Sequence, residues 1–325
     1  MSMKEYVSVR ALGAGSFGTV FKAKHRSSNR KVVLKMVRLD TASDPKRAEA
    51  EVLGEVAAMR LNHHRNVVPL LDSFWKTGSV KTLVIVMPLY ESGTLEDLIK
   101  HTKDDGVGMQ QAMVECYMAQ LAEGLAHIHG NGMVHRDIKP ANLFFNKWGE
   151  LIIGDLGLMR DAKGAHTMCG TPMYMPGEQF LNERYTHKVD VWAMGVILYE
   201  LMALATPWGK VAHIGALMAK IATVDLDGAA LKRLAAVYTP TLVKLVPLML
   251  RADPKDRPDA AEVARLFGVR KPDAQMVERA PDLDFDDDLM RTYCGGVSEM
   301  KLTWTGVDEG AISDASSTDG AGATP

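Results

Sequence analysis

The stretch His135-Arg136-Asp137-Ile138-Lys139-Pro140-Ala141-Asn142, followed shortly by Asp155, decides the fold of this chain. It brings together the carboxylates of Asp137 and Asp155, the ammonium of Lys139 and the amide of Asn142. Such groups hold an alcohol, a triphosphate and Mg²⁺ in line for phosphoryl transfer. We predict Asp137 as the catalytic base, or as the group that orients the substrate hydroxyl, and Lys139 as a contact to the transferred phosphoryl group. Asn142 and Asp155 are the predicted metal ligands, because Mg²⁺ prefers oxygen ligands.

A glycine-rich motif, Gly13-Ala14-Gly15-Ser16-Phe17-Gly18, lies between two strand patterns. Glycines allow backbone N–H groups to approach phosphates without a Cβ in the way. Alone, a G-x-G-x-x-G pattern is a weak signal. A dinucleotide site needs a helix after the glycines, whereas Val20 and Phe21 continue as a strand. The motif therefore predicts a strand–turn–strand lid over ATP.

Lys35 ends an apolar strand pattern and is predicted to neutralise the α- and β-phosphates. Glu55 lies in the middle of a helix predicted over residues 45–61, from which it could orient Lys35 through an ion pair. Glu49 and Glu51 on the same helix compete for this role. The sequence that follows the helix favours Glu55.

The apolar pattern changes along the chain from strands to helices. Alternating and β-branched residues predict strands within residues 6–38, then over 67–74 and 83–87, with the helix over 45–61 between them. From Leu95 the pattern is helical. The longer predicted helices cover residues 113–129, 191–204, 214–221, 241–250 and 260–267. This predicts an α+β fold with a small strand-rich lobe and a larger helical lobe.

Composition excludes several classes of protein. The 325 residues are 47% hydrophobic and 24% charged, with a net charge of −2, so bulk charge favours neither a nucleic-acid nor a membrane surface. Three widely spaced cysteines do not resemble a disulfide framework or a zinc site. The first residues lack the apolar core of a secretory signal, and the longest apolar run, 191–206, is interrupted by Glu200 and is shorter than a membrane span. We expect an intracellular protein, cytoplasmic or nuclear or both.

The last part of the chain differs in character. Residues 269–325 contain an acidic segment followed by small polar residues. Such a sequence cannot bury enough apolar surface to offset its chain entropy. We predict a disordered acidic tail, with an autoinhibitory or docking segment as the alternative.

From Tyr6 to about Gly268 the chain resembles a eukaryotic-type protein kinase. Lys139 and Gly170-Thr171 are typical of its serine/threonine branch, within which the chain is most similar to the NIMA-related (NEK) family. That similarity rests on the 135–142 stretch, Phe144, Gly154 before Asp155, Leu156 in the D-x-G triplet and the segment 164–175. The resemblance implies two lobes, 6–87 and 92–268, joined by a hinge at 88–91. It also implies ATP and Mg²⁺ as cofactors, with Mn²⁺ able to replace Mg²⁺, and protein substrates.

The resemblance further implies an ATP pocket with Met87 as gatekeeper behind the adenine. Pro88 would offer a carbonyl and Tyr90 an N–H to the adenine edge. The complete expected pocket is Leu12, Gly13, Ala14, Gly15, Ser16, Phe17, Gly18, Val20, Val33, Lys35, Met87, Pro88, Tyr90 and Phe144. A spine of stacked side chains would link the lobes through Met59, Leu70, His135 and Leu156.

Other implied roles are structural and regulatory. Asp190 would brace the catalytic stretch, serve as a helix N-cap, or do both. Arg257 would pair with Glu178, which follows Gly177 where the family has proline. This glycine loosens the backbone and puts the rigidity of the segment in question.

Thr167 is the predicted activating phosphorylation site, modified by an upstream kinase or by the enzyme itself, and Arg136 is the expected cation for the phosphate. The alternative is an unmodified loop threonine. Substrate preference is expected to depend weakly on basic residues because Ala141 carries no charge. Leu158 would favour serine, and an apolar pocket beyond the target residue would be formed by Met168, Pro172 and Met175.

Two other functions compete with an active protein kinase. A non-catalytic scaffold of the same fold commonly lacks one of the key polar residues, whereas Lys35, Asp137, Asn142 and Asp155 are all present. A small-molecule kinase of related fold is disfavoured by Lys139 and Thr171, which in protein kinases belong to a peptide platform.

Overall fold

The computed structural model describes residues 2–15, 18–39, 45–76, 78, 80–104, 108–156, 160–161, 170–181, 183–224, 226, 228–268 and 270. The chain divides into two units, Met1–Asp286 and Asp287–Pro325, and every described residue belongs to the first. Of the predicted tail, 269–325, all but Arg270 lies outside the described residues, so its disorder stays a prediction.

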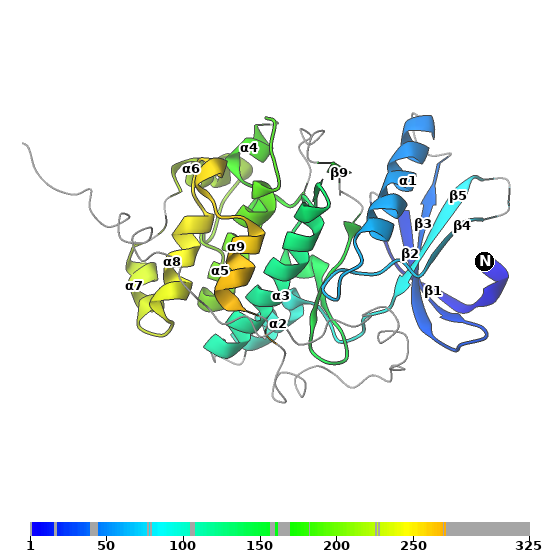
Figure 1. Ribbon diagram of the computed structural model, residues 1–325, viewed down its shortest axis with the longest axis horizontal. Coiled ribbons are helices and arrows are strands. Elements are labelled where there is room, and N and C mark those ends of the chain that lie inside the picture. The colour runs from blue at the N-terminus through cyan, green and yellow to red at the C-terminus, as the bar shows by residue number, and fades with distance from the viewer. Residues whose placement is uncertain are drawn as a thin grey trace, which may run out of the picture. The chain divides into compact units, whose positions relative to one another are not determined.

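The N-terminal lobe is a five-stranded antiparallel sheet with one long helix, coloured blue to cyan in Figure 1. Its strands lie in the order β1-β2-β3-β5-β4. They are β1 (Tyr6–Gly15), β2 (Gly18–His25), β3 (Lys31–Arg38), β4 (Asp72–Lys76) and β5 (Thr82–Pro88). A short 3-10 helix, Met3–Glu5, precedes β1, and the long helix α1 spans Pro45–Leu61.

Alternation along β5 gives this sheet two apolar faces. Leu83 and Ile85 belong to the same core cluster as residues of α1, whereas Val84 and Val86 pack with Leu34 on the opposite face. Successive side chains of a strand point to opposite faces, so one strand serves both clusters. The helix α1 is thereby fixed on one face of the sheet, and this decides where Glu55 points.

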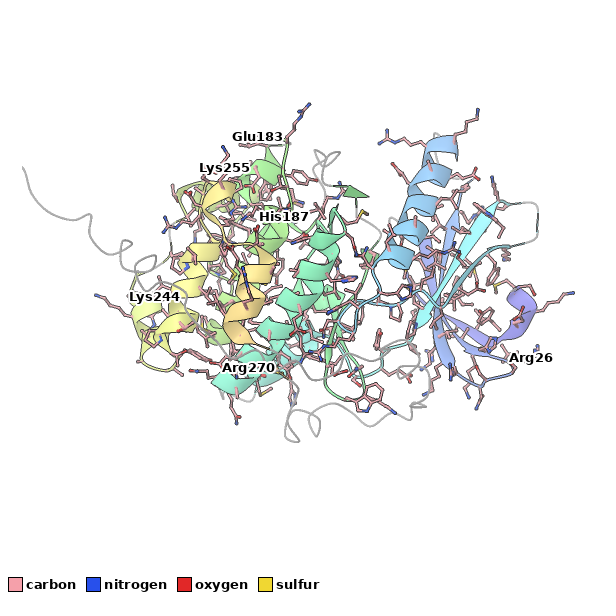
Figure 2. All side chains as sticks on the ribbon, viewed as in Figure 1. Arg26, Glu183, His187, Lys244, Lys255 and Arg270 are labelled. Atoms are coloured by element: carbon pink, nitrogen blue, oxygen red, sulfur yellow. The ribbon has the colours of Figure 1, made fainter. Side chains whose placement is uncertain are left out.

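The C-terminal lobe is built around two buried helices, α3 (Gln111–Gly130) and α5 (Lys188–Ala203). In the green to orange part of Figure 1, α9 packs along α3 and α8 along α5. The other helices of this lobe are α2 (Leu95–Asp104), α4 (Gly177–Phe180), α6 (Ile214–Thr223), α7 (Gly228–Ala235), α8 (Pro240–Met249) and α9 (Ala260–Phe267). Charged side chains such as Glu183 and Lys244 project outward in Figure 2.

Short elements carry the catalytic stretch between these helices. The pair β6 (Met133–Val134) and β9 (Arg160–Asp161) precedes and follows it, and β7 (Leu143–Phe145) pairs with β8 (Leu151–Ile153). A 3-10 turn, Pro140–Asn142, ends the stretch, and further 3-10 turns cover Pro172–Tyr174 and Pro254–Asp256. The polar residues of the stretch therefore lie in loops whose two ends are fixed by strands.

The α+β prediction is confirmed, and the helix over 45–61 has the predicted bounds. The strand predicted over 67–74 is wrong in its first half, because Val67 makes an isolated bridge to Ile153 and the strand begins at Asp72. The helices α4 and α7 were not predicted. No helix in the described part of the chain is long and apolar enough to cross a membrane.

Candidate active site

The backbone of the catalytic stretch is fixed by Asp190, a buried carboxylate of α5. Its two oxygens accept the backbone N–H groups of His135 and Arg136, each at 2.8 Å, and His129 Nε2 lies 2.8 Å from Oδ2. Burial works against ionisation, but the hydrogen bonds to His129 and His135 hold the pKa of Asp190 below its usual value. The N-cap of α5 is His187, so Asp190 braces the loop and the N-cap expectation is wrong.

Two residues of the site have a left-handed backbone, Arg136 with φ 73° and Asp155 with φ 52°. Such conformations cost a side-chain-bearing residue roughly 1–3 kcal/mol, and surrounding contacts must hold them in place. Arg136 is held by Asp190 and by Gln179, whose Nε2 donates to the Arg136 carbonyl at 3.1 Å. Residues of this kind cluster at functional sites, which agrees with the predicted position of the site.

Three side chains converge on the carboxylate of Asp137. Thr171 Oγ1 donates to Oδ1 at 2.9 Å. Lys139 Nζ donates to Oδ2 at 2.8 Å and Asn142 Nδ2 to the same oxygen at 3.0 Å. Lys139 also donates to Thr171 Oγ1 at 2.7 Å. The contact from Thr171 shows that Oδ1 accepts a hydroxyl group in this position, which is the geometry that a catalytic base requires.

Lys35 and Glu55 form a buried ion pair between β3 and α1. Their Nζ and Oε1 atoms are 2.7 Å apart, as the sequence predicted. The two competing glutamates have other partners: Glu49 pairs with Lys81 at 2.6 Å and Glu51 with Arg47 at 3.1 Å. Glu55 is therefore the helix residue that orients Lys35.

Asp155 and Asn142 offer oxygen atoms suited to Mg²⁺. Both N–H groups of the Asn142 amide are directed to Asp137, at 2.9 Å from its carbonyl and 3.0 Å from Oδ2, which leaves the amide oxygen as an acceptor. Asp155 is exposed, and its Oδ1 is 3.6 Å from Lys35 Nζ. The described residues contain no cluster of three or more His, Cys, Asp or Glu that could enclose a metal. Mg²⁺ is commonly held by one or two protein groups together with water and substrate phosphates, so this pair fits it.

Phe144 and Gly154 pack against one another beside Tyr90 of the hinge. A Cβ built on Gly154 would lie 2.5 and 2.7 Å from two ring carbons of Phe144, so the ring occupies the space that a side chain at 154 would fill. The ring also stacks on Tyr90 of the hinge, with centroids 6.2 Å apart. Two of the residues on which the NEK resemblance rests thus pack against each other.

The other expected pocket residues in the described part of the chain lie on β1, β2, β3 and β5. Met87 and Pro88 end β5 and pair with Val33 and Val32 of β3. Val20 pairs with Lys35 across β2 and β3, and Leu12 is exposed on β1. Gly13, Ala14, Gly15 and Gly18 belong to β1 and β2, whereas Ser16 and Phe17 lie outside the described residues. The sheet therefore brings the lid strands, Lys35 and the hinge to one side of the site.

A charged clamp that the sequence did not reveal ties this sheet to the hinge. Lys22 of β2 and Lys31 of β3 both bind the carboxylate of Glu91, the latter at 2.7 Å. Partial burial works against ionisation, but the two lysines hold the pKa of Glu91 below its usual value. The partners are far apart in the sequence, so only the antiparallel register of β2 and β3 could have suggested the clamp.

The predicted spine residues are all buried. Met59, Leu70 and Leu156 belong to one core cluster that continues from α1 into the C-terminal lobe. His135 is fully buried, and its Nε2 lies 2.9 Å from the carbonyl oxygen of Gly154. This agrees with a structural role for His135.

The segment after Gly170 is anchored to the C-terminal lobe. Gly170 has φ 108°, and a Cβ there would lie 2.5 Å from the Arg136 carbonyl oxygen, so the position requires glycine. Further on, Glu178 and Arg257 form the expected pair through two contacts of 2.6 and 3.1 Å. Gly177 begins α4, and a Cβ there would meet nothing within 4 Å, so packing within the described residues does not require this glycine.

The guanidinium of Arg136 is buried and donates to the Tyr185 hydroxyl at 3.4 Å. Thr167, its predicted phosphate partner, lies outside the described residues, as do Leu158 and Met168 of the substrate predictions. Pro172 begins the 3-10 turn that follows Thr171, and Met175 is the C-cap of that turn.

A half-buried carboxylate, not predicted, supports this turn. Glu200 of α5 accepts the Tyr174 hydroxyl at 2.8 Å. Burial raises the pKa of Glu200 and, more strongly, that of the Tyr174 hydroxyl. The hydrogen bond therefore fixes the turn on the long buried helix of the lobe.

A model of the protein kinase domain matches residues 6–266. This chain belongs to the protein kinase family, in agreement with the fold and with the convergence on Asp137. It is 31% identical over 267 residues to the probable serine/threonine-protein kinase nek2 of Dictyostelium discoideum, covering 80% of this chain and 62% of the relative. It is 32% identical over 269 residues to serine/threonine-protein kinase Nek4 of Mus musculus, covering 82% of this chain and 32% of the relative. It is 34% identical over 263 residues to serine/threonine-protein kinase Nek3 of Mus musculus, covering 79% of this chain and 48% of the relative.

These similarities confirm the NEK-like resemblance. The chain spans less than two thirds of the length of each of these relatives. The similarity therefore concerns the kinase domain that they share.

Proposed function

We propose that this protein is an active serine/threonine protein kinase, which transfers the γ-phosphoryl group of ATP to hydroxyl groups of proteins. The observation that carries the proposal is the convergence of Thr171, Lys139 and Asn142 on Asp137, with the pair of Lys35 and Glu55 on the other lobe. Phosphoryl transfer needs positioning and charge neutralisation more than covalent chemistry, and these residues supply both.

Each residue has a defined task in this mechanism. Asp137 orients the substrate hydroxyl and accepts its proton through Oδ1. Lys139, held between Asp137 and Thr171, neutralises charge on the phosphoryl group in flight. Lys35, oriented by Glu55, binds the α- and β-phosphates. Asn142 and Asp155 would hold Mg²⁺, which when bound neutralises the phosphate oxygens.

We further propose that phosphorylation of Thr167 activates the enzyme. The buried guanidinium of Arg136 is a suitable cation, because its backbone is fixed by Asp190 and its side chain donates to Tyr185. A phosphate on the neighbouring segment would form charge-assisted hydrogen bonds with it. Thr167→Ala should lower the activity of the phosphorylated enzyme to that of phosphatase-treated protein. Full activity in Thr167→Ala would refute this step.

Transfer of radiolabelled phosphate from ATP to a general protein substrate tests the main proposal. Wild-type protein should label serine and threonine, whereas Asp155→Ala and Asp137→Asn should lose at least about 10²-fold in rate. Lys244→Gln, a change at a side chain that projects outward in Figure 2, is the control for loss of a charge. Equal labelling by wild type and Asp155→Ala would refute the proposal and favour a non-catalytic scaffold. Labelling of small alcohols but not of proteins would favour a small-molecule kinase.

A further inference from the structure

The connection between the two lobes is short and is held at both ends. Pro88 still belongs to the sheet of the N-terminal lobe, where it pairs with Val32 of β3. Soon after it, the Gly93 carbonyl accepts the backbone N–H of Phe145 in β7 at 3.0 Å. Residues 89–92 therefore carry the chain from one lobe to the other.

Glu91 lies in this connection, next to a turn that is fixed on the C-terminal lobe. In that turn Asp97 Oδ2 accepts the backbone N–H of Thr94 at 2.9 Å and its hydroxyl at 2.8 Å. Ser92 is buried, and Gly93 has a left-handed backbone with φ 78°. The turn leads directly into α2, so we expect Glu91 to move with the C-terminal lobe.

Lys22 and Lys31 belong to the N-terminal lobe and share a sheet face with Lys35. They lie on β2 and β3, which are neighbours in the sheet (Figure 1). Ala23 and Val32 belong to the apolar cluster on the opposite face. Lys22 and Lys31 are their neighbours in the sequence, so they point away from that cluster. Lys35 points the same way, because it follows Lys31 by an even number of positions in β3.

Both lysines bind the one carboxylate of Glu91, and we call these three residues the Glu91 clamp. Oε1 accepts from Lys22, and Oε2 accepts from Lys31 at 2.7 Å. The side chain of Glu91 is only 14% exposed, compared with 36% for Lys22 and 30% for Lys31. Single exposed ion pairs contribute little, whereas partial burial and several charges in one network strengthen the contact. Removal of Glu91 would leave two ammonium groups that repel each other.

We propose that the Glu91 clamp is a latch across the hinge that sets how fast nucleotide leaves the protein. Nucleotide held between the lid strands and the hinge leaves when these strands move away from the C-terminal lobe. That movement separates Lys22 and Lys31 from Glu91, so the clamp opposes it. The inference rests on the proposed function, because the nucleotide site is part of that proposal.

Glu91 is a positioning residue in this arrangement and not a catalytic one. Its carboxylate binds the two lysines, whereas the groups for phosphoryl transfer converge on Asp137. Loss of the clamp should therefore weaken nucleotide binding without slowing the chemical step. The KM for ATP should rise about fivefold, while the KM for the protein substrate stays unchanged and kcat does not fall. General damage to the fold would instead lower kcat.

The binding test uses the full chain with Mg²⁺ and a fluorescent analogue of ADP, displaced by excess ADP in a stopped-flow instrument. Glu91→Gln should raise the dissociation rate at least about fivefold, because the carboxylate charge is lost and the lysines repel. Lys31→Met should raise it at least about twofold, since Lys22 still holds the carboxylate. In the double variant the two effects should not add, because both changes break the same contact.

Matched variants separate the charge of the clamp from general effects on folding. Glu49→Gln removes the carboxylate of an ion pair within the N-terminal lobe, 2.6 Å from Lys81, and should leave the dissociation rate unchanged. Reversal of all three clamp charges, by Lys22→Glu, Lys31→Glu and Glu91→Lys together, rebuilds the contact with opposite signs. It should restore the wild-type rate to within about twofold. Circular dichroism confirms that each variant is folded.

Two outcomes would overturn the proposal. One is a wild-type dissociation rate in folded Glu91→Gln or folded Lys31→Met. The other is fast release in Glu91→Gln that the charge reversal does not slow, because Glu91 would then act through packing and not through charge.

Phosphoryl-transfer measurements separate this inference from the proposed function. Faster nucleotide release in the clamp variants, with no phosphoryl transfer even by the wild type, would refute the proposed function and leave the clamp intact. Transfer by wild type and Glu91→Gln with the same KM for ATP would refute the clamp and leave the proposed function intact.

Discussion

Two buried pairs of glutamate and a cation fix the two lobes, and they differ in how the cation is held. Lys35 contacts Glu55 at 2.7 Å and Asp155 at 3.6 Å. Arg257 binds Glu178 through two nitrogens, and its guanidinium lies 4.8 Å from the ring centroid of Trp192. It also donates to the carbonyl oxygens of Arg251, Lys188 and Ala252.

We call the pair of Arg257 and Glu178 the fixed anchor and the pair of Lys35 and Glu55 the exchangeable contact. The guanidinium of Arg257 has partners in several directions, so no single movement releases it. Lys35 lies between Glu55 on α1 and the exposed Asp155, so we expect it to change partners when nucleotide binds. We expect loss of the first pair to affect stability and loss of the second to affect catalysis.

Removal of Arg257 tests the fixed anchor and should have the largest effect. Arg257→Met leaves Glu178 buried without its cation and should lower the free energy of unfolding by about 3–5 kcal/mol. Urea denaturation measures this directly. Arg184→Met, at an exposed position of the same lobe, is the control. A loss below about 1 kcal/mol would mean that neither the ion pair nor the carbonyl contacts of Arg257 anchor the segment.

Removal of Lys35 tests the exchangeable contact. Lys35→Met should lower kcat/KM by about 10²–10³-fold, equivalent to roughly 3–4 kcal/mol of transition-state stabilisation, with a smaller loss of stability than Arg257→Met. Glu55→Gln should reduce activity less, because Lys35 itself remains. Steady-state kinetics and urea denaturation of the same preparations give both values. A stability loss equal to that of Arg257→Met would remove the distinction between the two pairs.

The junction between α1 and the C-terminal lobe should be sensitive to acid. His64 stacks on His127 of α3 with ring centroids 5.1 Å apart. Burial, then the neighbouring His127 and Arg65, lower the pKa of His64 to about 4 from 6.5. Between these values the unfolded chain binds a proton that the folded protein excludes. Stability should therefore fall by about 1–3 kcal/mol as the pH falls through this window, and be retained above it.

Urea denaturation at neutral pH and near pH 4.5 measures this loss, and His64→Gln should remove part of it. His101→Gln, at an exposed position of α2, controls for loss of a histidine. An unchanged pH slope in His64→Gln would assign the acid sensitivity to other groups.

The smallest expected effect is a gain in stability at Gly177, next to Glu178 of the fixed anchor. Gly177→Ala should raise the free energy of unfolding by about 0.5–1 kcal/mol, because alanine restricts the unfolded chain and its Cβ has room. Thermal unfolding followed by circular dichroism would detect the change. Gly170→Ala, where a Cβ meets the Arg136 carbonyl at 2.5 Å, should instead destabilise. Destabilisation by both would indicate that Gly177 is needed for a backbone movement.

Features set by short-range pattern could be predicted from the sequence. The helix over 45–61 and its inward face follow from spacing along one element, and the sequence that follows the helix favoured Glu55 over Glu49 and Glu51. The order of the polar residues in the 135–142 stretch similarly indicated that they share one small site, because a short loop between strands has few ways to arrange them.

Features set by long-range packing could not be predicted from the sequence. The clamp of Lys22 and Lys31 on Glu91 joins residues about 60 positions or more apart, and each alone resembles an ordinary surface charge. The strand predicted from 67 failed because the backbone N–H of Val68 donates to Ile153 of the other lobe, at 2.8 Å, instead of entering the sheet. Apolar content alone does not distinguish such a buried connection from a strand.

The contact between Phe144 and Gly154 has a consequence for how this sequence can change over time. With the phenylalanine ring in place, even one methyl group at position 154 would collide with it. A smaller residue must therefore appear at 144 before any side chain can be accepted at 154. The two positions can therefore change in only one order, residue 144 first and residue 154 second.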